Sequence, residues 1–356
     1  MEFHFLTKAF FSGALVGVLG LVFHLYNTLV AKPETLRSAL KRQGVSGPRP
    51  TLLLGNILEI KKARDSTAKA STNGAPASHN CGATLLPFFD NWRKQYGDVF
   101  MFSLGNTQIV HVTQPAMVRE ITTCTSLDLG KPTYQAKERG SLLGQGILTS
   151  NGTIWAHQRK ILAPELYMEK VKGMITLVQG STITLLNCWD NISKKDDPNS
   201  SSAIFSNTPI HSILQLTMAI NESLRLYPPV AVVSREALTD MKFGDLNIPK
   251  GVNLWTIVTT LHTDPDNWGP DSYQFNPERF ANGITGACKF PHLYMPFGVG
   301  PRVCLGQNLA LVELKILISL ILSKFSFTLS PKYIHSPALN LVIEPGHGVN
   351  LLVQKL

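Results

Sequence analysis

The sequence predicts a mainly α-helical domain with small β-sheets, preceded by one transmembrane helix. Three observations indicate this fold class. A nearly continuous apolar run lies close to the N-terminus, from Ala9 to Ala31. Long segments with helical spacing of apolar residues follow, among them Lys170 to Ile192 and Gln307 to Leu322. Between them lie short runs of β-branched and aromatic residues bounded by glycine, proline and asparagine, which is typical of strands and turns.

The N-terminal run has the length and composition of a membrane anchor. As a helix, Ala9 to Ala31 would extend about 34 Å, enough to cross a bilayer. The short lead before it and the lack of a small-residue cleavage site favour a retained anchor over a cleaved signal peptide. Only Lys8 precedes the run, whereas four basic residues follow it closely: Lys32, Arg37, Lys41 and Arg42. The positive-inside rule therefore places the rest of the chain in the cytosol.

Two connecting segments come next. Gly47 to Pro50 (GPRP) predicts a stiff proline hinge, because proline fixes φ. Lys61 to Asn80 is rich in alanine, serine, threonine and lysine and has no core pattern, so we expect a flexible loop there.

The first half of the domain has a helix, hairpin, helix order. Leu85 to Tyr96 predicts an amphipathic helix. Val99–Leu104 and Gln108–Val112, joined by a Gly-Asn-Thr turn, predict a β-hairpin. A helix then opens at Pro115. Near the C-terminus, two further strands are expected at Phe325–Leu329 and Val349–Val353.

Composition excludes several classes of function. The chain has 356 residues, 44% of them hydrophobic, so it can bury a sizeable core. Its 33 basic and 24 acidic residues give a net charge of +9, but the basic residues are scattered and do not alternate with aromatics as a nucleic-acid groove requires. We expect a basic surface facing a membrane or a partner, and no nucleic acid. The five cysteines show no zinc or disulfide spacing, which indicates a reducing compartment.

One cysteine stands in a loop suited to hold a metal ion. The segment Pro296 to Gly306 (PFGVGPRVCLG) is dense in glycine and proline, and the helical run from Gln307 follows at once. A thiolate at a helix N-terminus is stabilised by the helix dipole and by free backbone N–H groups. Glycines let a flat partner approach the backbone, and Arg302 offers a fork of donors to a carboxylate on that partner.

The loop resembles the haem-ligand loop of the cytochromes P450. The shared pattern is Phe-x-x-Gly-x-Arg-x-Cys-x-Gly, present here as Phe297, Gly300, Arg302, Cys304 and Gly306. The resemblance implies the cytochrome P450 fold and a haem b whose iron takes Cys304 as its axial thiolate. The five motif residues would then form part of the haem-binding site.

Two further motifs extend the resemblance. Trp155 and Arg159 lie at i and i+4, on one helix face, and resemble the W-x-x-x-R helix. The resemblance implies that both bind a haem propionate, together with Arg302 and with Arg235 farther along the chain. Glu222-x-x-Arg225, followed by Leu-Tyr-Pro-Pro, resembles the E-x-x-R helix, and Arg279 supplies the third member of its ion network. These three residues would have a structural role: Glu222, Arg225 and Arg279.

The resemblance also implies where a substrate would bind. The glycine-containing stretch 127–152 would line the pocket through Leu142, Leu143 and Ile147, for which ordinary loop packing is an equally good interpretation. Ala231 to Val233 would face the haem, and the turn from Pro337 to Leu341 would touch substrate.

One part of the family pattern is missing. P450s carry a long helix across the haem with an acid–alcohol pair, A-G-x-[DE]-T-[TS], which delivers protons to iron-bound oxygen. No such motif occurs between Ile161 and Ile220, although Thr182 and Thr184 follow Gly180. No acid–alcohol catalytic pair is therefore identified. The segment between Arg159 and Glu222 is also too short for the helices normally found there, so we predict an internal truncation.

The resemblance divides the chain into five regions. They are an anchor (1–31), the hinge and flexible loop (32–82), the N-terminal part of the P450 domain (83–192), an abnormal junction (193–215) and the C-terminal haem-binding part (216–356). The implied location is the endoplasmic reticulum membrane, with a single pass and a cytosolic domain.

The implied function is a monooxygenase that inserts one oxygen atom of O2 into a small hydrophobic substrate. Electrons would come from NADPH through a membrane-bound P450 reductase. Leu52–Asn56 (LLLGN) and Trp92–Gly97 (WRKQYG) resemble the plant microsomal group that includes gibberellin- and terpenoid-oxidising members. The alternative is a catalytically impaired, truncated fragment that at most binds haem, and the missing acid–alcohol helix favours it for this chain.

Overall fold

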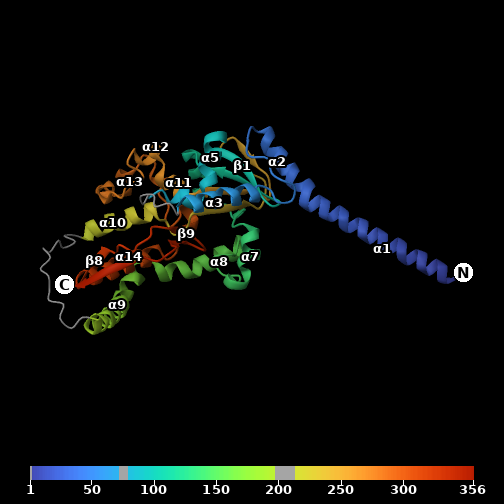
Figure 1. Cartoon of the computed structure of the whole chain (residues 1–356). Helices are drawn as coiled ribbons and strands as arrows, with labels where there is room; N and C mark the ends of the chain where they lie inside the picture. Colours follow the sequence, from blue (N-terminus) through green and yellow to red (C-terminus); the bar gives the residue numbers. More distant parts are fainter. Residues whose placement is uncertain (1, 72–78, 197–212) are drawn as a thin grey trace.

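The structure, a computed structural model, describes residues 2–71, 79–196 and 213–356 (Figure 1). Its helices are α1 (Glu2–Tyr26), α2 (Lys32–Arg42), α3 (Ile57–Ser71), α4 (Cys81–Leu85), α5 (Pro87–Tyr96), α6 (Pro115–Thr123), α7 (Thr133–Leu143), α8 (Gly152–Leu162), α9 (Met168–Asp196), α10 (Ile213–Leu226), α11 (Val258–Thr263), α12 (Pro265–Trp268), α13 (Gly283–Ala287) and α14 (Gln307–Leu322). Its strands are β1 (Val99–Leu104), β2 (Thr107–Val112), β3 (Leu129–Gly130), β4 (Val232–Ala237), β5 (Met241–Phe243), β6 (Leu246–Ile248), β7 (Asn253–Ile257), β8 (Phe325–Leu329), β9 (Pro337–Leu339), β10 (Ile343–Pro345) and β11 (Leu351–Lys355). The predicted fold class, mainly helical with small sheets, is confirmed.

The largest sheet has five strands in the order β1-β2-β7-β4-β3. β1 and β2 form the predicted antiparallel hairpin. β7 runs parallel to β2 and antiparallel to β4. Short β3 pairs with β4 so that Gly130 lies opposite Glu236. The residues that follow β3 are therefore held beside β4, at the edge of the sheet nearest the cysteine loop.

A separate hydrophobic core lies on each face of this sheet, because alternate residues of a strand point to opposite faces. Phe100 and Phe102 of β1 pack with Phe89 and Trp92 of α5 in an aromatic core. The ring centroids of Phe89 and Phe102 are 5.5 Å apart, in an edge-on arrangement. Met101, between the two phenylalanines, packs instead into an aliphatic core with residues of α2 and α6.

The N-terminal helix projects away from the domain (Figure 1). α1 continues through a π-helical turn, Asn27–Ala31, directly into α2. The residues from Phe10 to Tyr26 are all exposed, and the helix is long and apolar enough to cross a membrane. This arrangement agrees with the predicted anchor. The π-turn belongs to the apolar run, and α2 extends the helix beyond it.

The expectation of a flexible loop at Lys61 to Asn80 is wrong for its first half. Residues up to Ser71 belong to α3, whose Ile60 and Ala63 pack against the aromatic core. Glu59 also accepts a hydrogen bond from the indole N–H of Trp92, at 2.9 Å. Tertiary contacts of a few residues therefore stabilise a helix that has no strong apolar stripe. Residues 72–78 lie outside the described part of the chain.

The predicted junction at 193–215 is described only at its ends. α9 extends to Asp196, a few residues beyond the expected helix end at Ile192, and α10 begins at Ile213. The glycine-containing stretch 127–152 also differs from expectation, because it contains helix α7.

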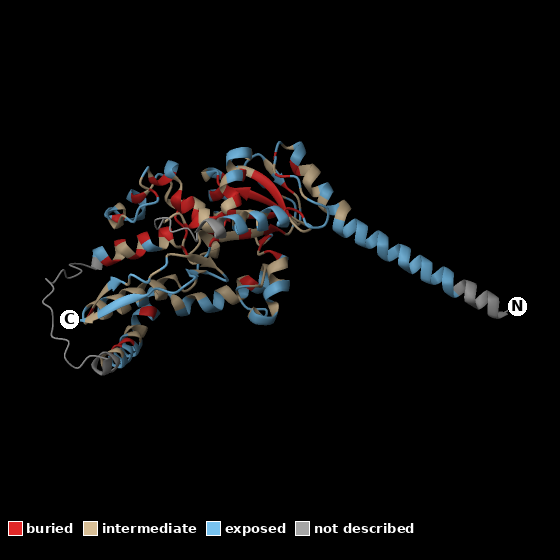
Figure 2. Ribbon diagram, viewed as in Figure 1, coloured by how far each residue is buried: buried red, intermediate tan, exposed pale blue. Residues whose placement is uncertain are grey.

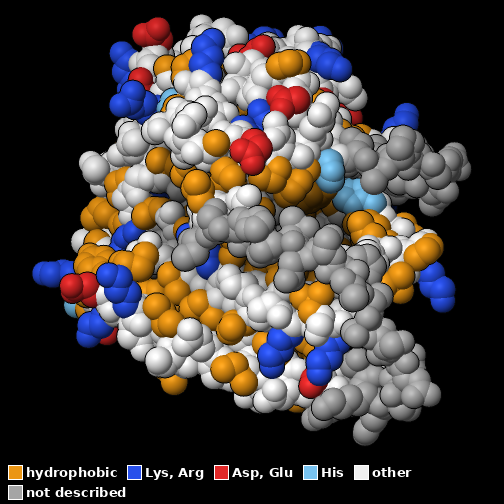
Figure 3. Space-filling model, turned by 90° about the vertical axis from the view of Figure 1, so that its left-hand side faces the viewer, with side chains coloured by type: hydrophobic (Ala, Val, Ile, Leu, Met, Phe, Trp, Pro, Cys, Tyr) orange, Lys and Arg blue, Asp and Glu red, His pale blue; other side chains and the backbone are white. Residues whose placement is uncertain are grey.

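Few other elements pack against the half of the domain that contains α8, α9 and α14. α14 is apolar on nearly all sides, yet none of its residues is buried (Figure 2). A helix that is apolar all round is normally enclosed by other elements. Between α10 and α14 lies an apolar groove of ≈ 600 Å³, lined on the α14 side by Leu314, Ile318 and Leu322. Figure 3 shows hydrophobic side chains gathered in the band between the two halves.

Candidate functional site

The cysteine loop is held in a fixed conformation by its own backbone. The N–H of Cys304 donates to the carbonyl oxygen of Phe297 at 2.8 Å. Gly298 and Gly300 have φ values of +75° and +73°, which other residues rarely adopt. A Cβ atom at Gly300 would lie only 2.3 Å from the carbonyl oxygen of Thr122, at the end of α6. The motif glycine at 300 is thus required both for conformation and for close packing.

Cys304 lies just before the N-terminus of α14 and is exposed. Among the described residues, it is not hydrogen-bonded through its sulfur. Gly306 lies beside the sulfur, and a Cβ there would meet the Cys304 Sγ at 4.0 Å, an ordinary van der Waals contact. The thiol can therefore be reached by a large planar partner.

Trp155 joins the cysteine loop to α8. Its ring is almost fully buried, and the guanidinium carbon of Arg302 lies 4.1 Å from the ring centroid. Arg159, one turn along α8, lies 5.7 Å from the same ring. Arg159 also donates to the carbonyl oxygen of Val303 at 2.9 Å. The structure thus brings together the predicted Trp155, Arg159, Arg302 and Cys304, which come from two motifs far apart in the sequence.

A third and a fourth cationic side chain complete this cluster. Arg235 lies on β4, and Lys131 follows β3, opposite Arg235 when the strand register is continued by one residue. Asn151 fixes the Lys131 backbone by accepting from its N–H at 2.6 Å and donating to its carbonyl at 2.9 Å. The Lys131 ammonium donates to the carbonyl oxygens of Ile147 and Ser150. Sequence reasoning missed Lys131, because no local pattern marks it and only the strand pairing brings it to the site.

The cluster carries positive charge without a compensating carboxylate. Within the described residues, none of Lys131, Arg159, Arg235 and Arg302 forms an ion pair. Burial and, secondarily, the nearby arginines lower the pKa of Lys131 to about 8. Burial, followed by repulsion from Arg302, lowers the pKa of Arg235 to about 10. The buried Nη1 of Arg302 has no hydrogen-bond partner. Such a site favours a ligand that carries anionic oxygens.

Glu222 and Arg225 form a fully buried bidentate ion pair on α10. Arg225 Nε and Nη2 donate to the two carboxylate oxygens of Glu222 at 2.7 and 2.8 Å. The remaining donors of Arg225 reach the carbonyl oxygen of His262, in α11, and those of Ser272 and Gln274, in the irregular segment that precedes the cysteine loop. Full pairing of this kind is what a buried guanidinium needs. Arg279 lies 3.7 Å from Glu222 and pairs more closely with Asp271, at 2.7 Å.

His262 extends this network to the cysteine loop, and sequence reasoning missed it. Its Nε2 accepts from the N–H of Met295 at 2.9 Å, and its Nδ1 lies 3.1 Å from the carbonyl oxygen of Arg225. These contacts require a neutral imidazole that donates from Nδ1. Burial lowers the pKa of His262 to about 3. The ring thus ties α10 to Met295, the residue just before the cysteine loop begins at Pro296.

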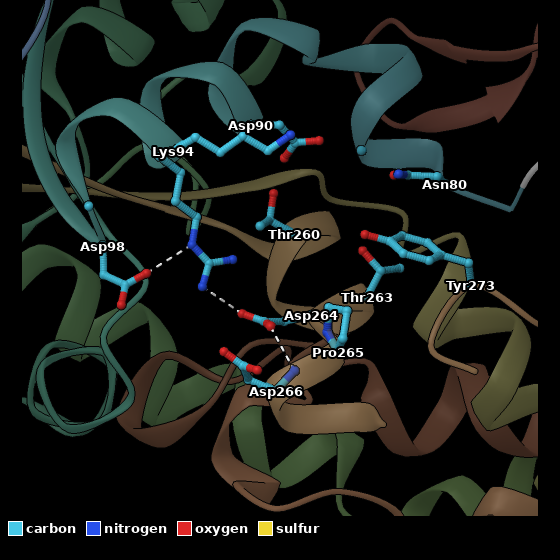
Figure 4. A pocket seen from close by; sticks show the side chains of 13 residues that line it. Asn80, Asp90, Lys94, Asp98, Thr260, Thr263, Asp264, Pro265, Asp266 and Tyr273 are labelled. Carbon is cyan, nitrogen blue, oxygen red and sulfur yellow. Dashed lines mark hydrogen bonds and ion pairs between the residues drawn. The ribbon is translucent and has the colours of Figure 1, made fainter. Parts of the chain in front are cut away.

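A second cavity, of ≈ 560 Å³, lies between α5 and the α11–α12 segment and contains no residue of the cysteine loop (Figure 4). Arg93 bridges Asp98 and Asp264 there, with N–O distances of 2.8 Å to each. Asp264 also accepts from the backbone N–H of Asp266 at the start of α12. These side chains satisfy one another, so we interpret the cavity as a structural salt-bridge site.

The suggested substrate-contacting residues are not gathered in one place. Leu142, on α7, is 74% exposed. Ala231 and Val232 pack with the aromatic core, whereas Val233 packs with the aliphatic core on the other face of the sheet. Leu339 of β9 also packs against the aromatic core. Thr182 and Thr184 donate back to carbonyl oxygens of their own helix, α9.

The family model and the relatives that match this chain all belong to one protein family. The family model described as Cytochrome P450 matches residues 78–217 and 208–347. The chain is 36% identical to cytochrome P450 714C2 of Oryza sativa subsp. japonica, in an alignment covering 94% of this chain and 95% of that protein. It is 30% identical to cytochrome P450 714A2 of Arabidopsis thaliana, with coverages of 95% and 97%. It is 32% identical to cytochrome P450 714B3 of Zea mays, with coverages of 98% and 96%.

The length of these alignments bears on the predicted truncation. The alignment with the 714C2 protein runs over 499 positions, although the chain has only 356 residues, so it includes long gaps on the side of this chain. The two stretches that match the family model meet at residues 208–217, inside or next to the predicted junction. Both findings agree with an internal truncation.

Proposed function

The chain belongs to the cytochrome P450 family of haem-thiolate monooxygenases, and we propose that its own site binds haem b with Cys304 as the axial ligand. When bound, the thiolate-ligated iron would supply the oxygen-activating chemistry of the family. The protein's part is to hold the ring, to balance its charge and to exclude water around it.

The observation that carries this proposal is the unpaired cationic cluster beside an exposed thiol. Haem b carries two propionates, and their charge matches the need of Lys131, Arg159, Arg235 and Arg302 for anionic partners. The orphaned Nη1 of Arg302 would find an acceptor there. Trp155 would hold Arg159 and Arg302 in place. Phe297, Gly300 and Gly306 would shape the loop around the sulfur, and Glu222, Arg225 and Arg279 would fix the segment leading to it.

The family activity further suggests the reaction and its setting. It is the insertion of one oxygen atom of O2 into a small hydrophobic molecule, with electrons from NADPH delivered by a membrane-bound reductase. The resemblance of Leu52–Asn56 and Trp92–Gly97 to gibberellin- and terpenoid-oxidising members supports a terpenoid substrate. Exposed, apolar α1 supports a single-pass anchor in the endoplasmic reticulum membrane, with the domain in the cytosol.

A second candidate function is haem binding without turnover. The observation that favours it is α14, an apolar helix with no buried residue beside the open groove to α10. Together with the missing acid–alcohol motif, this leaves the chain without a described group that could deliver protons to oxygen. For the chain as it stands we expect a membrane-tethered haem protein that forms no hydroxylated product.

Haem titration tests the site itself. The purified full chain in detergent should bind hemin at one per chain and show the red-shifted Soret band of a thiolate ligand after reduction and addition of carbon monoxide. Cys304→Ser should abolish this band. Cys188→Ser, at an exposed cysteine on α9, should leave it unchanged. A thiolate spectrum that survives Cys304→Ser would remove the axial ligand that we propose.

Turnover separates the two candidate functions. The haem-loaded chain is mixed with reductase, NADPH and a gibberellin-type diterpenoid, and products are analysed by mass spectrometry. We expect no product from this chain. A chimera with the central segment of the 714C2 relative inserted between Asp196 and Ile213 should gain NADPH consumption and product. Hydroxylation by the unmodified chain would instead support the monooxygenase.

A further inference from the structure

Three ring side chains from distant parts of the chain meet at one hydroxyl group. The phenol oxygen of Tyr227 lies 2.6 Å from Nδ1 of His79 and 3.3 Å from Nε2 of His335. The ring centroids are 5.8 to 6.1 Å apart in every pair, and all three side chains are half-buried. Two imidazole nitrogens and a phenol oxygen therefore converge on one point. These three residues are called the His–Tyr site below.

The fold holds each member of the His–Tyr site in place. The backbone carbonyl of His79 accepts from the N–H of Cys81 at 2.9 Å, and Cys81 is buried in the aromatic core. Tyr227 follows α10 directly, and its N–H donates to the carbonyl oxygen of Ser223 at 2.8 Å. His335 lies two residues before β9, which pairs with β10. The three side chains are thus positioned by the protein itself, as a binding site requires.

The second ring nitrogen of His335 is engaged as well. Its Nδ1 lies 2.8 Å from the hydroxyl oxygen of Tyr333. When Nδ1 carries the proton and donates to that oxygen, Nε2 presents its lone pair towards Tyr227. Histidines that bind metal ions are oriented in this way, by a hydrogen bond from the ring nitrogen that does not touch the ion. Tyr333 therefore favours the tautomer of His335 that can bind a metal.

The His–Tyr site is close to neutral and open to solvent. Burial and, secondarily, the neighbouring His335 lower the pKa of His79, so at neutral pH its ring is uncharged and can donate a lone pair to a metal ion. The ion pair of Glu222 and Arg225 also acts on His79, but its two charges oppose each other. Tyr227 lines the groove between α10 and α14, which gives an ion a path from solvent.

We propose that the His–Tyr site binds Zn²⁺ through Nδ1 of His79, the phenolate oxygen of Tyr227 and Nε2 of His335. Binding releases the phenol proton of Tyr227 to solvent, so the phenolate offsets one of the two charges of the ion. Zinc accepts nitrogen and anionic oxygen ligands, and it takes a water molecule beside three protein ligands. Among the described residues, no three histidine, cysteine or carboxylate side chains are grouped for a metal ion, so Tyr227 completes the site.

A bound ion would cross-link three segments of the domain: the chain that enters α4, the end of α10 and the segment before β9. An ion that binds only the folded state stabilises it by mass action. Zinc should therefore raise the unfolding temperature of the chain. The His–Tyr site shares no residue with the cysteine loop or the cationic cluster, so this effect should not depend on haem.

Zinc titration tests the His–Tyr site in the full chain. The protein is purified in detergent through a tag without histidine, stripped with a chelator, and titrated calorimetrically with Zn²⁺ or Mg²⁺. We expect one tightly bound Zn²⁺ per chain and no Mg²⁺, because Mg²⁺ prefers oxygen ligands. Zinc should also produce the ultraviolet difference band of one tyrosinate. X-ray absorption of the zinc-loaded chain should show nitrogen and oxygen ligands and no sulfur.

Substitutions identify the ligands. His79→Ala and His335→Ala should abolish tight zinc binding and the rise in unfolding temperature. Tyr227→Phe should remove the tyrosinate band. Tyr333→Phe, which removes the hydrogen-bond partner of His335, should weaken binding about 10–100-fold. His347→Ala, at an exposed histidine in the same C-terminal segment, is the matched control and should bind zinc as the parent does.

The parent chain alone can overturn the proposal, whether or not every variant folds. Failure to bind zinc, or a sulfur ligand in the X-ray absorption spectrum, would do so. Undiminished zinc binding by a His79 or His335 variant with the circular dichroism spectrum of the parent would also overturn it. Hemin titration of the same samples reports separately on the proposed haem site.

Discussion

The guanidinium of Arg302, in the cysteine loop, stacks 4.1 Å from the ring centroid of Trp155, in α8. This contact connects two motifs that are far apart in the sequence and sets the position of the cationic cluster next to Cys304. Arg302 is held further by its hydrogen bond to the carbonyl oxygen of Leu129, at 2.9 Å. The stack therefore joins the cysteine loop, α8 and the edge of the five-stranded sheet.

Trp155→Ala should weaken both the fold and haem binding. The ring is almost fully buried, and deletion of such an aromatic side chain costs about 3–5 kcal/mol. Urea unfolding and hemin titration measure the two effects. Trp155→Phe keeps a ring under Arg302 and should recover most of the loss. If the alanine variant bound hemin with parental affinity, the stack would have no part in the site.

Removing the Lys131 charge should stabilise the haem-free chain at neutral pH and weaken hemin binding. At that pH Lys131 is crowded by three arginines without a carboxylate, so Lys131→Met should raise the free energy of unfolding, by about 1 kcal/mol or less. Lys137→Met, on the exposed part of α7, is the matched control and should change neither quantity. Stability below that of the parent would contradict the unpaired cluster.

The same lysine predicts an alkaline pH dependence. The folded-state pKa of Lys131 is lowered to about 8 from its usual value of 10.5, so the unfolded chain binds more protons between these values. Stability of the haem-free chain should therefore rise as pH increases through this window. Lys131→Met should remove that contribution. Urea unfolding at several pH values gives the slope of the free energy of unfolding against pH for the parent and for Lys131→Met. Identical slopes for the two proteins would contradict the lowered pKa of Lys131.

His262 predicts a loss of stability in acid. Its pKa is lowered to about 3 by burial, so between that value and its usual 6.5 the unfolded state binds the extra proton. Its contribution to the free energy of unfolding should fall by up to about 1.4 kcal/mol per pH unit below pH 6.5 and be constant above it. His111, also buried with a pKa lowered to about 3, should add a similar slope.

A substitution isolates the part due to His262. His262→Ala leaves the N–H of Met295 without its acceptor and should cost about 1–3 kcal/mol at pH 7. The slope of the free energy of unfolding against pH, between pH 6.5 and 3, should become shallower than in the parent. His157→Ala, at an exposed position on α8, should leave both unchanged. An unaltered acid slope in the His262 variant would show that its burial does not hold in solution.

Glu222→Gln should be strongly destabilising. It removes the charge that balances the fully buried guanidinium of Arg225, and breaking such a pair by changing one partner costs about 3–5 kcal/mol. Chemical denaturation followed by circular dichroism measures the change. Glu278→Gln, an exposed carboxylate nearby, serves as the control. If Glu222→Gln lowered the free energy of unfolding by less than about 1 kcal/mol, the pair would contribute no more than an ordinary surface ion pair.

Much of this fold was predictable because its signals are local. The apolar N-terminal run, the β1–β2 hairpin and the helix after the cysteine loop depend on residue types within one element. Lys61 to Ser71 was predicted wrongly because its helix is stabilised by a few contacts with α5, which leave almost no periodic pattern. Cys304, Trp155, Arg159 and the Glu222–Arg225 pair were found because their types and spacings form motifs.

The sequence by itself determined the family, the candidate haem ligand and the absence of the acid–alcohol motif, since each is written in a short run of residues. Only the tertiary structure decided which distant side chains share the site. Lys131 joins it through the pairing of β3 with β4, and His262 through burial beneath the cysteine loop. The lack of buried residues on apolar α14 likewise appears only in three dimensions, because burial depends on which elements pack against a helix and not on its own composition.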